Sequence, residues 1–154
     1  MTVPAKEESK EDAVSSGLVR VIPVEEFDFV NVDNNTSLSV LVASRIEVGD
    51  VRDGDLIARL HDVSWPTSGS GASLAVEVLQ DGHTEQDPAT PLLGETLATA
   101  TFQQSYHTTA SVIVKSLSGA LGQYVAVQLT AHQANSDSPG VFKITLSVDL
   151  MLKG

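Results

Sequence analysis

The four histidines are the residues of this sequence best suited to hold a metal ion or to transfer a proton: His61, His83, His107 and His132. They lie in four separate segments, without the H-x-H or H-E-x-x-H spacing that brings two imidazoles to one metal. We expect His61 to point outward from an alternating strand, and His83 and His107 lie in or near turns. The sequence therefore predicts surface histidines, no metal site and no other cofactor.

A second candidate for cation binding is the group of Asp50, Asp53 and Asp55 around Gly54. Carboxylate oxygens are the ligands that calcium prefers, but this spacing has neither the closing Glu nor the flanking helices of an EF-hand. Asp and Gly also supply the backbone conformations of a tight turn directly. We interpret this segment as a turn.

Two further patterns bear on catalysis. Ser70 stands between two glycines, but the run lacks the full G-x-S-x-G pattern and the strand-to-helix turn that exposes such a nucleophile. Glu25, Glu26 and Asp28 are the kind of acidic group that a glycosidase uses, yet aromatic residues make up only 5% of the chain. Few rings are therefore available to stack on a sugar. We predict that the protein is not an enzyme.

The charge of the chain excludes several classes of partner. The formal net charge is −11, and all of it falls in residues 1–91, because three basic residues balance three acidic ones in residues 92–154. Such a chain repels nucleic acid and anionic membranes, which bind clustered Lys and Arg. The acidic N-terminus has no apolar run of a signal peptide, and no segment approaches the ~20 apolar residues of a spanning helix. With no cysteine in the sequence, disulfides are excluded, and we expect synthesis in a cytoplasm.

The closing segment, 141–153, defines the fold class. Six apolar residues alternate there with more polar ones, and this period of two is typical of an antiparallel strand with one buried face. Similar segments recur along the chain, separated by turn residues and without a helix of ordinary length. We predict strands over 18–32, 38–48, 56–65, 74–78, 95–103, 111–117, 123–132 and 141–153.

These strands predict one all-β domain over residues 18–154, an antiparallel β-sandwich with a jelly roll as the favoured topology. Within it we expect Pro23 to mark an edge or a break, Leu38 and Val40 to be buried, and the last three strands to form a meander. Residues 1–17 differ in being charged and Ser-rich. We interpret them as a short N-terminal arm that docks on a partner surface.

Some apolar residues fall where a partner could cover them. Trp65 ends its strand on the side opposite Leu56, and other apolar residues lie on the nominally polar faces of their strands or in the arm. We also weigh the interpretation that Trp65 caps the open end of the sandwich. The predicted partner interface comprises Val3, Pro4, Val14, Leu41, Trp65, Leu79, Ile113 and Met151.

The last third of the chain resembles the end of certain tailed-phage capsid cement, or head decoration, proteins. In that family a Gly-x-Tyr-Val strand leads through a polar turn to a closing strand rich in Thr and Leu. The matching positions are Gly122, Tyr124, Val125, Val127, Leu129, Gly140, Phe142 and Leu146. The arm and the segment 81–92 match no family pattern. The resemblance implies a jelly-roll domain that sits outside a capsid shell and bridges neighbouring capsomers.

We therefore expect a structural protein of the phage virion, made in the host cytoplasm, that binds the exterior of an icosahedral capsid. Its expected partners are the major capsid protein and further copies of itself, as a dimer or a trimer. The alternative is a carbohydrate- or receptor-binding β-sandwich module of a virion or a cell surface.

Overall fold

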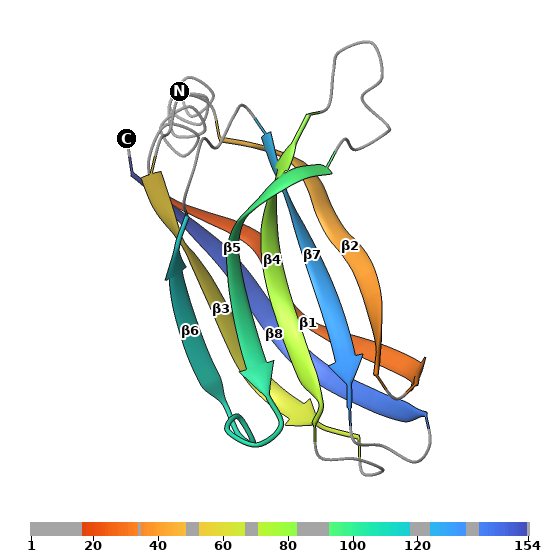
Figure 1. The fold of residues 1–154 in the computed structure, drawn as a ribbon. Coiled ribbons are helices and arrows are strands. Elements are labelled where there is room, and N and C mark those ends of the chain that lie inside the picture. The colour runs from red at the N-terminus through yellow and green to blue at the C-terminus, as the bar shows by residue number, and fades with distance from the viewer. Residues whose placement is uncertain are drawn as a thin grey trace.

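The computed structural model describes residues 17–33, 35–48, 53–66, 71–82, 93–117, 124–134 and 139–153, and all its regular elements are strands (Figure 1). None of the described residues forms a helix that could span a membrane. Apart from Gly17, the predicted arm lies outside the described residues. The eight strands are β1 (Gly17–Val32), β2 (Thr36–Glu47), β3 (Asp53–Ser64), β4 (Ser73–Asp81), β5 (Leu93–Gln103), β6 (Ser111–Ser116), β7 (Tyr124–Gln133) and β8 (Gly140–Lys153).

The strands form two antiparallel four-stranded sheets that pack face to face, as the sequence predicted. Sheet A has the order β1-β8-β3-β6 and sheet B has the order β2-β7-β4-β5. The pairs β1 with β8, β2 with β7, β3 with β6 and β4 with β5 are nested, as in one long antiparallel ribbon that has been rolled into two layers. This topology is a jelly roll.

The predicted meander of the last three strands is wrong. β6 pairs with β3, β7 lies between β2 and β4, and β8 lies between β1 and β3, so none of the three is a neighbour of another. Strands adjacent in sequence often pair in space, which is why the meander was expected. In this fold the chain instead turns back along the ribbon between β4 and β5, and each strand from β6 onward joins the sheet opposite to that of the strand before it.

The core lies between the sheets and is supplied mainly by the inner faces of β3, β4, β7 and β8. The alternation of β8 predicted this correctly, since the six alternating apolar residues from Phe142 to Leu152 are at most 2% exposed. The inner residues of the other central strands are buried as well, namely Leu56, Ala58, Leu60, Leu74, Val76, Val78, Val125, Val127, Leu129 and Ala131.

The edge strands depart from simple alternation. β1 lies at the edge of sheet A, as Pro23 predicted, and it continues through Pro23 with a shift of its register against β8 between Ile22 and Glu25. The predicted burial of Leu38 and Val40 is wrong, because they are 41% and 42% exposed. β2 is the edge of sheet B and pairs only with β7 among the described strands, so its inner face is incompletely covered.

Candidate functional site

The described histidines lie apart from one another, and each imidazole is within hydrogen-bonding distance of a serine hydroxyl or a backbone N–H. His61 Nε2 lies 2.8 Å from Ser147 Oγ, and His132 Nδ1 lies 2.9 Å from Ser37 Oγ. His107 accepts a 2.9 Å hydrogen bond from the backbone N–H of Gln103 and stacks edge-on against Phe102. No group of three metal-ligating side chains occurs in the described part of the chain, and His83 lies outside it.

The carboxylates singled out in the sequence also have local partners. Asp53 accepts a 2.8 Å hydrogen bond from the N–H of Gly54, and Asp55 forms a 2.9 Å ion pair with Lys153. That hydrogen bond, and then the charge of Asp55, raise the pKa of Lys153 above its usual value. Asp28 lies opposite Lys143 in the β1–β8 ladder. Asp50 and Ser70 are outside the described residues.

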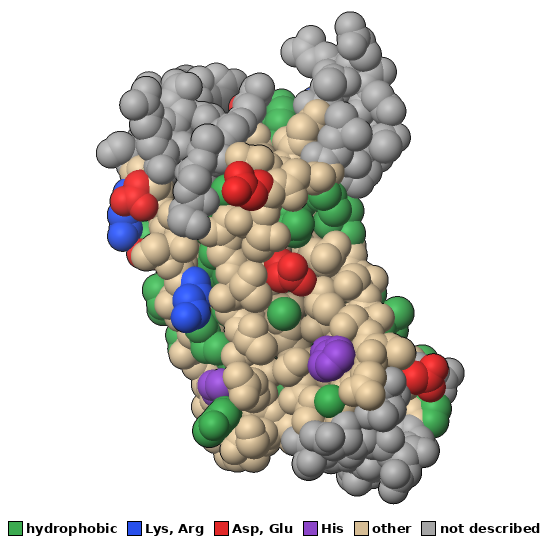
Figure 2. Space-filling view, in the orientation of Figure 1, with side chains coloured by type: hydrophobic (Ala, Val, Ile, Leu, Met, Phe, Trp, Pro, Cys, Tyr) green, Lys and Arg blue, Asp and Glu red, His purple; other side chains and the backbone are tan. Residues whose placement is uncertain are grey.

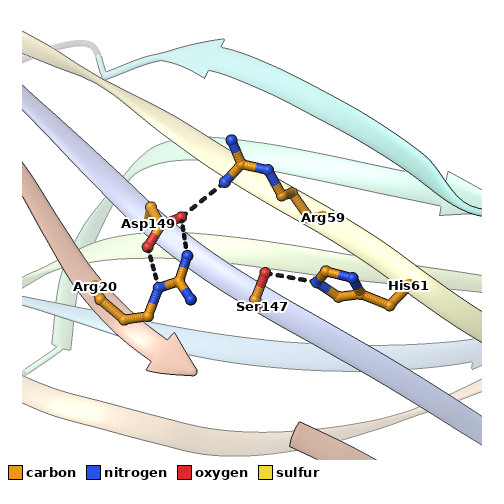
Figure 3. Close-up of polar contacts among 5 residues, drawn as sticks. All are labelled: Arg20, Arg59, His61, Ser147 and Asp149. Carbon is orange, nitrogen blue, oxygen red and sulfur yellow. Dashed lines mark hydrogen bonds and ion pairs between the residues drawn. The ribbon is translucent and has the colours of Figure 1, made fainter. Parts of the chain in front are cut away.

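The most developed polar cluster is on the outer face of sheet A, where one carboxylate joins three strands (Figure 3). Asp149 of β8 is fully buried and accepts hydrogen bonds of 2.7 and 3.0 Å from Arg20 of β1. It accepts a further bond of 2.8 Å from Arg59 of β3. The hydrogen bond to Asp149, followed by its charge, raises the pKa of Arg20. The two guanidinium groups lie over the carboxylate and compensate its burial.

The neighbouring Ser147 and His61 form a serine–histidine pair in the same cluster (Figure 3). Nucleophilic catalysis requires a hydroxyl that the substrate can reach and a third group that orients the imidazole. Ser147 is only 1% exposed, and the nearby carboxylate of Asp149 is bound to the two arginines. The pair therefore links β3 to β8 and offers no open nucleophile.

Sequence reasoning placed Asp149 on the polar face of β8 but missed its partners. Arg20 is 129 residues from Asp149 in sequence and Arg59 is 90 residues away. Only the strand order β1-β8-β3 brings them together. The available signal was a single acidic residue in the middle of an otherwise uncharged stretch of a central strand.

The structure does not gather the predicted interface residues into one patch. Leu41 lies half-buried on β2, Leu79 of β4 is only 8% exposed, and Met151 lies on the outer face of sheet A opposite Leu18. Val3, Pro4 and Val14 lie outside the described residues. The role of these residues in binding stays a prediction.

Two of these residues face the opposite way from the sequence prediction. A β-bulge between Leu60 and Asp62 shifts the alternation of β3 by one residue, so Trp65 packs against the core and contacts Phe142 edge-on. Its indole N–H donates a 2.8 Å hydrogen bond to the carbonyl of His107. On β6, Ile113 packs against the core, whereas Val112 and Val114 are 58% and 57% exposed.

The outer face of sheet B is lined mostly by uncharged side chains, and Glu77 of β4 also lies on it. Figure 2 views this face, and most of it is uncharged polar side chains and backbone, with few acidic, basic or histidine side chains. Strand pairing places small or neutral residues side by side on it, namely Ser37, Ser39, Ser73, Ala75, Thr99, Thr101, Gln103, Gln128, Thr130 and His132. We call this surface the sheet B face.

Side-chain hydrogen bonds hold part of the sheet B face in place. The hydroxyl of Thr130 donates a 2.7 Å bond to Glu77, and Ser39 Oγ lies 2.9 Å from the same hydroxyl oxygen. Since the only proton of the Thr130 hydroxyl goes to Glu77, Ser39 must be the donor to Thr130. This series of hydrogen bonds crosses β2, β7 and β4. It restrains the side-chain rotamers of Ser39, Thr130 and Glu77.

A shallow depression of about 240 Å³ lies at one end of the sheet B face. Its lining includes Ser73, Thr101 and Gln103, and none of the described residues that line it is charged. A site for a charged ligand or a metal needs charged or metal-ligating groups that converge on one point. The depression therefore makes the face uneven, and its described lining does not form a site for a charged ligand or a metal.

No protein-family model and no curated protein matches this sequence. Solved structures of infectious bursal disease virus share the fold. The Gt strain structure aligns over 90% of this chain with a TM-score of 0.56 and 7% identity, and the Gx strain structure over 89% with 0.54 and 10%. A VP2 subviral particle of the same virus aligns over 88% with a TM-score of 0.50 and 11% identity.

This chain spans about a third of the length of those proteins, namely 33%, 33% and 31% of them. At such low identities the likeness concerns the fold alone. Together, the nested strand order and these neighbours define the chain as an antiparallel jelly-roll β-sandwich.

Proposed function

We propose that this protein is a non-enzymatic cement protein that binds the outside of an icosahedral phage capsid as a homo-oligomer. The observation that carries the proposal is the sheet B face, a broad, nearly uncharged surface on a rigid sandwich. The resemblance of the last third of the chain to capsid cement proteins gives the proposal its specific partner, the major capsid protein.

The chemistry of the sheet B face suits burial against another protein. Interface cores are depleted of charged residues, because each charge must be desolvated when the partner docks. Hydroxyl and amide side chains cost less to desolvate and can exchange hydrogen bonds with water for bonds to a partner. The pre-ordered chain from Ser39 through Thr130 to Glu77 also lowers the entropy lost on docking.

The fold neighbours support a structural role by analogy. The solved structures with this fold include a VP2 subviral particle of infectious bursal disease virus. In the present chain, the outer polar cluster of Asp149 is occupied by Arg20 and Arg59, and Ser147 is buried. Both features favour a scaffold over a catalytic site.

The experiment that tests the proposal is cosedimentation of the purified protein with phage shells that lack it. Ser39→Glu and Gln103→Glu each place a negative charge at an exposed position of the sheet B face, and Gln103 lies opposite the uncharged Ser73. We expect both variants to fold and to bind shells at least about tenfold more weakly, since an unpaired charge would be buried. Ser64→Glu is the matched control, because Ser64 is an exposed position opposite Lys143 on sheet A.

Two results would rule the proposal out. One is a strict monomer in analytical ultracentrifugation together with no binding to such shells. The other is a glycan array in which the protein binds a sugar and the sheet B face variants lose that binding. For a sugar-binding module the described residues offer little platform, since Tyr106, at 76%, is their one strongly exposed aromatic ring.

A further inference from the structure

We propose that the edge of β6 with which no described strand pairs joins antiparallel to β6 of a second copy of this chain, so that the two A sheets become one continuous sheet. This inference deepens the homo-oligomer part of the proposed function by naming the self-contact, and it does not depend on which shell is bound. It also predicts a two-fold dimer, since such pairing is closed and isologous.

The first observation is that β6 is the most regular of the four sheet edges. Edge strands are usually blunted by prolines, bulges or charges, because their unpaired N–H and C=O groups otherwise recruit another strand. β1 carries Pro23 and three register shifts, while the pairings of β2 and β5 each contain two shifts. The β3–β6 pairing from Leu60 with Ser111 to Asp55 with Ser116 contains none.

The second observation is the pair of exposed valines on β6. Val112 and Val114 are 58% and 57% exposed on the outer side of the strand, although β-branched residues are well suited to cross-strand packing. Figure 1 shows β6 at the rim of the molecule, next to β3. Its other side is anchored, because Ile113 packs against the core.

The sequence of β6 is self-complementary in one antiparallel register. When Ile113 lies opposite its own copy, Val112 lies opposite the second copy's Val114, and Lys115 lies opposite the second copy's Ser111. Residues that are directly opposite point to the same side of an antiparallel pair. This register therefore packs four valines side by side on one face and opposes no like charges.

The charges around β6 also favour a second copy at this edge. The chain as a whole carries −11, so two copies repel each other over most of their surfaces. β6 itself contains only Lys115, and the acidic residue opposite its end, Asp55, is paired with Lys153. Arg59 of β3, which lies opposite Val112 in the β3–β6 ladder, forms an ion pair with Asp149. Self-repulsion is thus small where the edges meet.

The test is the oligomeric state of the full chain, measured by sedimentation equilibrium, with two variants that differ by one residue. In Val112→Lys/Val114→Lys, lysines face lysines across the two-fold axis, and we expect the dimer dissociation constant to rise by about tenfold or more. In Val112→Lys/Val114→Glu, each lysine faces a glutamate of the other copy, and we expect dimerisation to be kept. Both positions are exposed, so both variants should keep the wild-type thermal midpoint.

Several outcomes would overturn the inference. A wild-type protein that is monomeric or trimeric excludes the two-fold pairing, and so does a dimer that the double-lysine variant leaves unchanged. Loss of dimerisation in both variants would exclude this register. If the double-lysine variant loses shell binding while the wild type is a monomer, the edge of β6 serves the shell instead. A monomeric variant that still binds shells would separate this contact from the proposed function.

Discussion

At the scale of single residues, the best-defined feature is the buried carboxylate of Asp149 between two arginines. Asp149 is fully buried, whereas the side chains of Arg20 and Arg59 are 50% and 40% exposed. The two cations can therefore return to water if the carboxylate is removed, but the carboxylate cannot if the cations are removed. The sequence showed a charged residue on the polar face of β8, and its partners became identifiable only through strand order.

This asymmetry predicts a non-additive effect of removing the arginines. Arg20→Met or Arg59→Met alone leaves Asp149 with one guanidinium, and we expect each to lower the free energy of unfolding only slightly, because the remaining cation still compensates the carboxylate. The double variant leaves a buried charge without a cation, and we expect a loss of about 3–5 kcal/mol. The four free energies of unfolding, of the wild type, the two single variants and the double variant, form a double-mutant cycle that urea denaturation measures.

The matching control for this cycle is Asp149→Asn. In that background no carboxylate is left to pair, so the arginine substitutions should cost little and their effects should add. If the effects of the two arginines were additive in the wild type as well, Asp149 would not depend on them as a pair.

At the scale of strands, the sequence predicted central strands well and edge strands poorly. β8 is a central strand, and its alternating apolar residues from Phe142 to Leu152 all point inward and are buried, as predicted. Alternation fails where a bulge adds a residue, as before Trp65 on β3. It also fails on edge strands: Leu38 on the inner face of β2 is 41% exposed, and on β6 the inward residue is Ile113 and not Val112. These features depend on strand order and register, which local periodicity does not encode.

The central position of β8 predicts which of its apolar residues carry stability. Leu146 is fully buried between Glu25 of β1 and Leu60 of β3, whereas Val141 on the same strand is 45% exposed. We expect Leu146→Ala to lower the free energy of unfolding by about 2–5 kcal/mol, because it leaves a cavity. Val141→Ala should change it by no more than about 0.5 kcal/mol. Equal denaturation midpoints for the two variants would contradict the assigned faces.

At the scale of the whole molecule, the nested topology joins the two ends of the domain. β1 pairs with β8, so the first described strand covers one side of the last. β1 also contributes Ile22, Phe29 and Val32 to the core, each at most 3% exposed. Sequence periodicity predicted eight strands in one domain, but it could not predict this closure, because it links residues more than 100 positions apart.

The closure gives a test of the predicted division between arm and domain. Deleting residues 2–16 leaves β1 complete, so we expect the thermal midpoint to stay nearly unchanged while binding to shells weakens. Deleting residues 2–32 removes β1 and uncovers the edge of β8 together with the core, and we expect this variant not to fold. Thermal unfolding followed by circular dichroism, with cosedimentation alongside, measures both effects. A large fall in the midpoint of the shorter deletion would show that residues 2–16 stabilise the sandwich, and the docking-arm interpretation would then be wrong.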